Sequence, residues 1–191
     1  MTETWRCFVA VPIGERLRDE LAVATSAWQA EEDAPDLRWA DPAGWHITLA
    51  FLGSTDPVAV AGITERLAAA AATHGPLVVD GGALGAFPRP GAARVLWYGI
   101  GADPRLTALA ADVGVELGVG DARPLRPHLT LARARDRDGT DLRGWLDGRM
   151  APHGAIAVDE LVLYRSHLGR GPARYEAVAR VPLHAAATVP A

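Results

Sequence analysis

Hydrophobic and polar residues alternate in two distinct ways along the chain. In several short segments every second residue is apolar, which is the pattern of a strand with one buried face. In longer segments apolar residues recur at every third or fourth position, which places them on one side of a helix. These patterns predict strands over 5–11, 45–52, 77–84, 93–100, 127–133, 156–165 and 174–181, and helices over 15–30, 57–74, 103–118 and 140–147.

The predicted elements occur in the same order twice. Each half has a helix, a strand with a histidine, a second helix and a pair of strands, over about 14–101 and 102–183. A duplication of this kind predicts one α+β domain over residues 1–191, built from two similar lobes. Ligand clefts tend to form where lobes join, so we expect the two histidine strands to meet at a cleft there.

The two histidine strands carry nearly the same sequence. Residues 46–50 read HITLA in the first half, and residues 128–132 read HLTLA in the second. A lone His-x-Thr is a weak motif, because it arises often by chance. Two copies in the same five-residue context, each on a predicted strand, indicate a matched pair with a function.

Strand geometry predicts which of these side chains point together. Residues two apart share a face, so His46, Thr48 and Ala50 are expected on one face and Phe51 on the core side. The same rule points Arg133 away from the second histidine, unless the strand bulges between them.

The matched pair suggests acid–base chemistry. Each strand offers an imidazole, which titrates near neutral pH, and a hydroxyl, which can donate to an anion. If the strands lie side by side, they supply an acid, a base and two hydrogen-bond donors. Nothing in that set requires a metal ion.

Composition narrows the class of protein. The 191 residues suffice for one domain, and the net charge of −4 disfavours a surface that coats nucleic acid. Cys7 is the only cysteine, which excludes an intramolecular disulfide, and the lack of lysine excludes a lysyl adduct. No segment reads as a membrane span or a signal peptide, so we expect a cytoplasmic monomer with no membrane partner.

A group of arginines surrounds the second motif without an intervening acid. Such a local positive patch on an acidic chain suits one phosphate group better than a long phosphate backbone. Its members are Arg123, Arg126, Arg133 and Arg135.

The chain resembles the 2H phosphoesterase superfamily and, within it, the RNA 2′,3′-cyclic phosphodiesterases, also known as 2′-5′ RNA ligase-like proteins. The resemblance extends over nearly the whole sequence and is carried mainly by the two histidine motifs. The runs that resemble the family are FVAVP at 8–12, LRW at 37–39, HITLAFLG at 46–53, RPHLTLAR at 126–133, LYRS at 163–166 and RYE at 174–176.

The resemblance implies a fold and an activity. It implies a bilobal, pseudo-twofold α+β fold with antiparallel sheets flanking a central cleft. It also implies metal-independent, cofactor-free opening of an RNA terminal 2′,3′-cyclic phosphate, or of a nucleotide 2′,3′-cyclic phosphate, to a 2′-phosphomonoester. By this analogy the site consists of His46 as proton donor, His128 as proton acceptor, Thr48 and Thr130 as catalytic donors, and Arg133, Arg126, Tyr164 and Arg165 as substrate-binding residues.

Three other functions fit the same residues. The chain could join RNA ends through a 2′-5′ linkage, since one acid and one base serve both directions of the reaction. It could act on small cyclic nucleotide phosphates. A module that binds RNA ends without cleaving them is a third possibility, although binding alone does not require two titrating groups.

Overall fold

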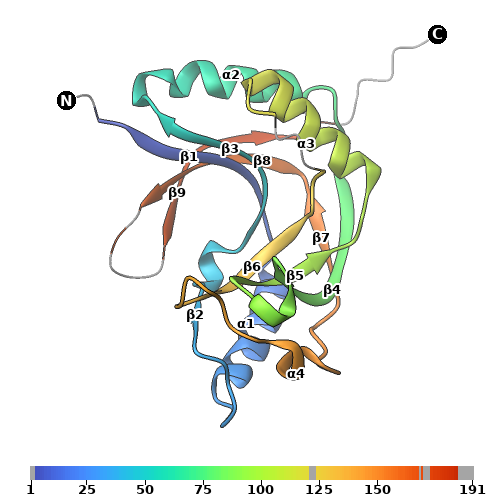
Figure 1. The fold of residues 1–191 in the computed structure, drawn as a ribbon. Helices are drawn as coiled ribbons and strands as arrows, with labels where there is room; N and C mark the ends of the chain where they lie inside the picture. The colour runs from blue at the N-terminus through green and yellow to red at the C-terminus, as the bar shows by residue number, and fades with distance from the viewer. Residues whose placement is uncertain (1–2, 121–123, 168, 170–172, 185–191) are drawn as a thin grey trace.

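The computed structural model describes residues 3–120, 124–167, 169 and 173–184, so Arg123 lies outside the described residues. The chain folds into two antiparallel sheets that are flanked by helices (Figure 1). None of the helices in these ranges is long and apolar enough to cross a membrane.

Sheet A combines strands from the two ends of the chain. Its order is β3-β1-β8-β9, so the N-terminal strand lies between the first histidine strand and the C-terminal hairpin. All of its pairings are antiparallel. The strands are β1 (Trp5–Pro12), β3 (His46–Thr55), β8 (Glu160–His167) and β9 (Arg174–Pro182).

Sheet B contains the second histidine strand. Its order is β2-β6-β5-β4-β7, again with antiparallel pairings throughout. The strands are β2 (Leu37–Trp39), β4 (Leu77–Phe87), β5 (Val95–Ile100), β6 (His128–Ala134) and β7 (Gly154–Val158).

The helices cover the outer faces of the sheets. Helices α2 (Val60–Ala71) and α3 (Pro104–Leu117) pack side by side on the face of sheet A that is turned away from sheet B (Figure 1). Helix α1 (Glu15–Gln29) contacts β7 of sheet B, and the short α4 is Arg143–Leu146. The apolar sides of the helices pack against the buried side chains of the strands, and together they form the hydrophobic core.

Two elements differ from the sequence prediction. The single strand predicted over 156–165 is two strands that separate at Asp159, with Val158 pairing in sheet B and Glu160 in sheet A. The apolar run continues across this crossover because both strands are buried, so its pattern does not show the break. Strand β2 was not predicted, since three residues are too short for a periodic pattern.

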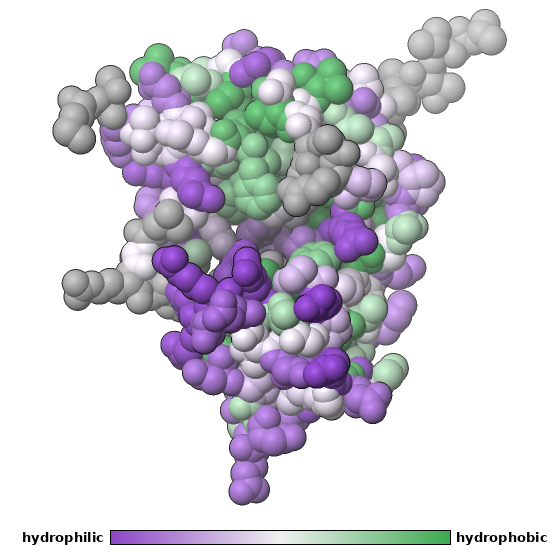
Figure 2. Space-filling view, in the orientation of Figure 1, coloured by the Kyte–Doolittle hydropathy of each residue, from purple (hydrophilic) through white to green (hydrophobic). Residues whose placement is uncertain are grey.

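The predicted class, an α+β fold with antiparallel sheets flanking a cleft, is confirmed. Strands β3 and β6 approach each other where the sheets meet. The molecular surface is hollowed between the upper part, which holds sheet A, and the lower part, which holds sheet B (Figure 2). Each sheet therefore contributes one histidine strand to the same cleft.

Candidate active site

The two histidines are anchored in the same way. Nδ1 of His46 lies 2.7 Å from the carbonyl oxygen of Gly44, and Nδ1 of His128 lies 2.7 Å from that of Arg126. A carbonyl oxygen only accepts, so each Nδ1 carries the proton and donates it. The Nε2 atoms are therefore the ones available for proton transfer.

Aromatic rings surround His46. The Phe8 ring centroid is 4.7 Å from the imidazole, and Tyr175 meets it edge-on at 5.0 Å. Burial among these rings lowers the pKa of His46 to about 4, against the partial compensation of the Gly44 hydrogen bond. The positive charge of a protonated His128 lowers this pKa further, so the two imidazoles lie within electrostatic reach of each other.

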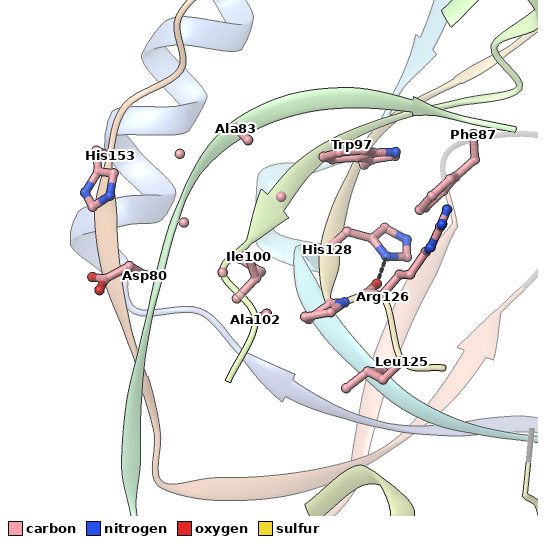
Figure 3. A pocket seen from close by; sticks show the side chains of 15 residues that line it. Asp80, Ala83, Phe87, Trp97, Ile100, Ala102, Leu125, Arg126, His128 and His153 are labelled. Atoms are coloured by element: carbon pink, nitrogen blue, oxygen red, sulfur yellow. Dashed lines mark hydrogen bonds between the residues drawn. The ribbon is translucent and has the colours of Figure 1, made fainter. Parts of the chain in front are cut away.

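His128 lies in a more open position on the opposite sheet. Phe87 meets its ring edge-on at 5.0 Å, and the carbonyl bond from Arg126 holds it beside the cavity drawn in Figure 3. Burial lowers the pKa of His128 as well, while its hydrogen bond to Arg126 raises it. Both imidazoles are thus biased toward the neutral form in the free protein.

The threonines follow the alternation of their strands. Thr48 and Thr130 are half-buried, whereas Ile47 and Leu129, between each histidine and threonine, are fully buried. Each hydroxyl therefore lies on the same face as its histidine, as expected from the spacing of two.

A bulge in β6 places Arg133 with the histidines. The register pairs Trp97 with Thr130 but Leu96 with Ala132, so Leu131 is an extra residue in β6. Leu131 and Ala132 are both buried, so two successive side chains point into the core. The next residue, Arg133, therefore lies on the same face as His128 and Thr130. The charge of Arg133 accordingly lowers the pKa of both His46 and His128.

The matching bulge in β3 corrects two sequence expectations. Ala10 pairs with Thr48 but Val9 with Ala50, so Leu49 is the extra residue. Ala50 is consequently buried rather than on the face of the threonine, and Phe51 is 68% exposed rather than in the core. Phe51 therefore occupies the position in β3 that Arg133 occupies in β6.

The remaining predicted residues lie in different surroundings. Tyr164 stacks on Phe8 at 5.3 Å and lies 5.8 Å from the His46 ring, so it belongs to the same cluster. Arg126 is beside the His128 cavity, with its guanidinium 6.0 Å from the Phe87 ring.

Arg165 is not brought to the histidines. Its guanidinium donates to Glu3 at 2.8 Å and lies over the Trp5 ring at 4.3 Å. Of the other arginines in the sequence patch, Arg135 pairs with Asp36 at 2.7 Å.

Sequence reasoning missed the aromatic residues that pack around the imidazoles. Phe8 and Tyr175 contact His46, and Phe87 contacts His128, although all three are distant from the motifs in sequence. The pattern within one strand does not show which residues of other strands lie beside it, because the pairing of the strands was unknown.

Metal coordination receives no support from the ligand arrangement. Within the described ranges, no group of three or more His, Cys, Asp or Glu side chains gathers closely enough to hold a metal ion.

Comparison with known proteins places the chain in a family. The family profile described as the 2′-5′ RNA ligase superfamily matches residues 17–170. An RNA 2′,3′-cyclic phosphodiesterase of Geobacillus stearothermophilus is 33% identical over 92% of this chain, and the chain spans 56% of that relative. One from Archaeoglobus fulgidus is 31% identical over 70% of this chain and 74% of its own length.

The fold has a solved counterpart. The crystal structure of E. coli LigT complexed with 3′-AMP superimposes with a TM-score of 0.70 at 25% identity, covering 95% of this chain and 99% of that one. The resemblance inferred from the two motifs is thereby confirmed. The chain belongs to the 2′-5′ RNA ligase superfamily.

Proposed function

We propose that the protein hydrolyses the terminal 2′,3′-cyclic phosphate of RNA to a 2′-phosphomonoester without a metal ion. The observation that carries this proposal is the paired arrangement of His46 and His128, each with Nδ1 held by a backbone carbonyl. The names of the curated relatives, RNA 2′,3′-cyclic phosphodiesterases, support the substrate class.

The reaction uses both imidazoles in one displacement. Nε2 of the neutral histidine takes a proton from water as the water oxygen attacks phosphorus. The bond from phosphorus to O3′ breaks, and the protonated histidine gives its Nε2 proton to O3′. Following the family resemblance, we assign His46 as the donor and His128 as the acceptor. Each proton transfer contributes about 10²–10⁴-fold to the rate.

The surrounding residues stabilise charge on the phosphate. Thr48 and Thr130 donate to its non-bridging oxygens, where negative charge grows in the transition state. Arg133 supplies a positive charge near both histidines, and Arg126 and Tyr164 complete the substrate-binding set. Arg165, which pairs with Glu3, supports the N-terminal strand instead.

A bound phosphate also prepares the acid. Burial disfavours the charged form of His46 in the free protein, but an adjacent anion favours it. Substrate binding therefore raises the pKa of the histidines and protonates one of them where the proton is needed. Because one chain supplies both histidines, we propose that the protein acts as a monomer. We also propose the cytoplasmic location that the sequence analysis expects.

Hydrolysis of a short RNA ending in a 2′,3′-cyclic phosphate, with EDTA present, tests the proposal. The wild-type protein is expected to release a 2′-phosphate end, and His46→Ala and His128→Ala to lose at least 10²-fold in rate. Loss of wild-type activity in EDTA would contradict the metal-free mechanism. Binding of the RNA without turnover would instead identify an end-binding module.

A substrate with sulfur in place of O3′ separates the two roles. A thiolate leaves without protonation, so it does not need a general acid. We expect this substrate to restore much of the activity of His46→Ala but not of His128→Ala. Rescue of His128→Ala alone would exchange the two roles.

A further inference from the structure

A cavity of about 600 Å³ opens beside His128 on the cleft side of sheet B (Figure 3). This volume lies within the range of small-molecule binding sites. Strands β4 and β5 and the segment before β6 line the cavity. Of its lining residues, only His128 and Arg126 have a role in the reaction proposed above, so most of the cavity is left without a function. Much of its floor is backbone, because the lining includes Gly81, Gly82, Gly99 and Gly101.

Trp97 lies flat on this floor. It faces Gly85 on β4, and Gly99 lies two residues further along β5. A Cβ atom on Gly85 would come within 2.2 Å of the indole, and one on Gly99 within 2.7 Å. The two glycines are therefore what allows the ring to lie across the sheet, with one face directed into the cavity.

The flat indole adjoins the catalytic groups. Trp97 pairs with Thr130 on the neighbouring strand, and Gly99 pairs with His128. Phe87 lies 5.4 Å from the Trp97 ring and also meets His128 edge-on, as Figure 3 shows. The aromatic surface of Trp97 would thus lie within the length of one nucleoside from a phosphate held by Thr130 and His128.

We propose that the nucleobase of the nucleotide bearing the cyclic phosphate stacks on Trp97, between Phe87 and the glycine floor. This inference rests on the proposed function and names the part of the substrate that the cavity holds. Aromatic faces bind bases of any sequence, since every base has a π-face. Arg126, at the rim of the cavity, adds a positive charge for the phosphodiester that continues the RNA strand.

Two cyclic phosphates, with and without a base, test the stacking. Adenosine 2′,3′-cyclic phosphate is expected to exceed the methyl riboside 2,3-cyclic phosphate in kcat/KM by about 5- to 150-fold in the wild type. In Trp97→Leu this ratio should fall close to one, because only the adenosine substrate loses a contact. Trp97→Phe, which retains a ring, should recover part of the ratio.

The matched control is Trp5→Leu, which makes the same substitution at the far end of β1 from Pro12, the residue that pairs with His46. This variant should keep the wild-type ratio. Unchanged turnover of the base-free substrate by Trp97→Leu shows that the variant is folded and that its catalytic groups are in place.

Several outcomes would overturn the inference. They are a wild-type ratio near one, a Trp97→Leu variant that keeps the ratio or loses activity equally on both substrates, and loss of the ratio in Trp5→Leu. If the wild type turns over neither substrate, the proposed function fails, and binding of adenosine 2′,3′-cyclic phosphate decides the question. Equal affinity of wild type and Trp97→Leu would then refute stacking, and weaker binding by the variant would support it.

Discussion

The carbonyl contacts of the two histidines fix both the tautomer and the orientation of each ring. With Nδ1 donating to Gly44 or Arg126, only Nε2 changes its protonation during a reaction. The rings differ in their surroundings, since His46 is enclosed by Phe8 and Tyr175 while His128 borders an open cavity. Burial therefore lowers the pKa of both histidines, but different rings enclose them: Phe8 and Tyr175 at His46, and Phe87 at His128.

The pH dependence of kcat/KM follows from these pKa values. The free protein must hold one proton between His46 and His128, which happens only between their two apparent pKa values. Below about 4 both are protonated and no base remains, whereas above the upper pKa, which lies under the ordinary 6.5, no acid remains. We expect a bell-shaped kcat/KM profile with its maximum on the acid side of pH 6.5.

Steady-state kinetics from pH 4 to 9 measure this profile. The kcat profile should lie at higher pH than that of kcat/KM, since a bound phosphate favours the imidazolium. His74→Gln is the control, because His74 pairs with Asp112 in the helical layer at 2.8 Å. A kcat/KM plateau that extends unchanged to pH 8 would contradict the pKa assignment.

At the scale of elements, the two bulges decide which side chains enter the cleft. Each follows the threonine of its strand, at Leu49 in β3 and Leu131 in β6. The bulges correspond, but the residues beyond them do not, since β3 presents Phe51 and β6 presents Arg133. The duplicated strands thus supply matched acid–base groups with a positive charge on one side only.

Removing that charge should have two effects. Arg133→Met is expected to lower kcat/KM by about tenfold or more, the typical loss for a hydrogen bond to a charged group. It should also move the kcat/KM profile to higher pH, because Arg133 lowers the pKa of both histidines. Rate measurements across the same pH range give both quantities.

Arg135→Met is the matched control two residues further along. Its guanidinium pairs with Asp36, so its loss should change neither the rate nor the profile. A profile for Arg133→Met that coincides with the wild type would show that this arginine acts outside the site.

The elements also show why prediction from sequence reached some residues and not others. The pairs His46–Thr48 and His128–Thr130 depend only on a spacing of two, which holds on any strand. Arg133 required the bulge, and a bulge arises from the register between strands rather than from the pattern within one. Trp97 was beyond reach for a related reason, since its flat position depends on Gly85 of the neighbouring strand.

At the scale of the molecule, the sheets do not correspond to the two halves of the sequence. Sheet A needs β1 and β3 from the first half and β8 and β9 from the second, and sheet B is mixed in the same way. The crossover at Asp159 passes directly from one sheet to the other. Neither half can therefore complete a sheet by itself, and we propose that residues 1–191 form one cooperative domain.

Urea unfolding tests this cooperativity by comparing a probe in sheet A with two signals from the whole molecule. Cys7, the only cysteine, lies on β1 at the centre of sheet A. It is 1% exposed, so a thiol reagent reaches it only after that sheet opens. The same burial raises the pKa of its thiol. Tryptophan fluorescence reports on both sheets, since Trp97 and Trp39 lie in sheet B and Trp5 lies in sheet A. Labelling of Cys7, tryptophan fluorescence and far-UV circular dichroism are expected to share one midpoint, as in a two-state transition. Labelling of Cys7 at lower urea than the other two signals would mean that sheet A opens independently, and the two histidines would then belong to separately folding units.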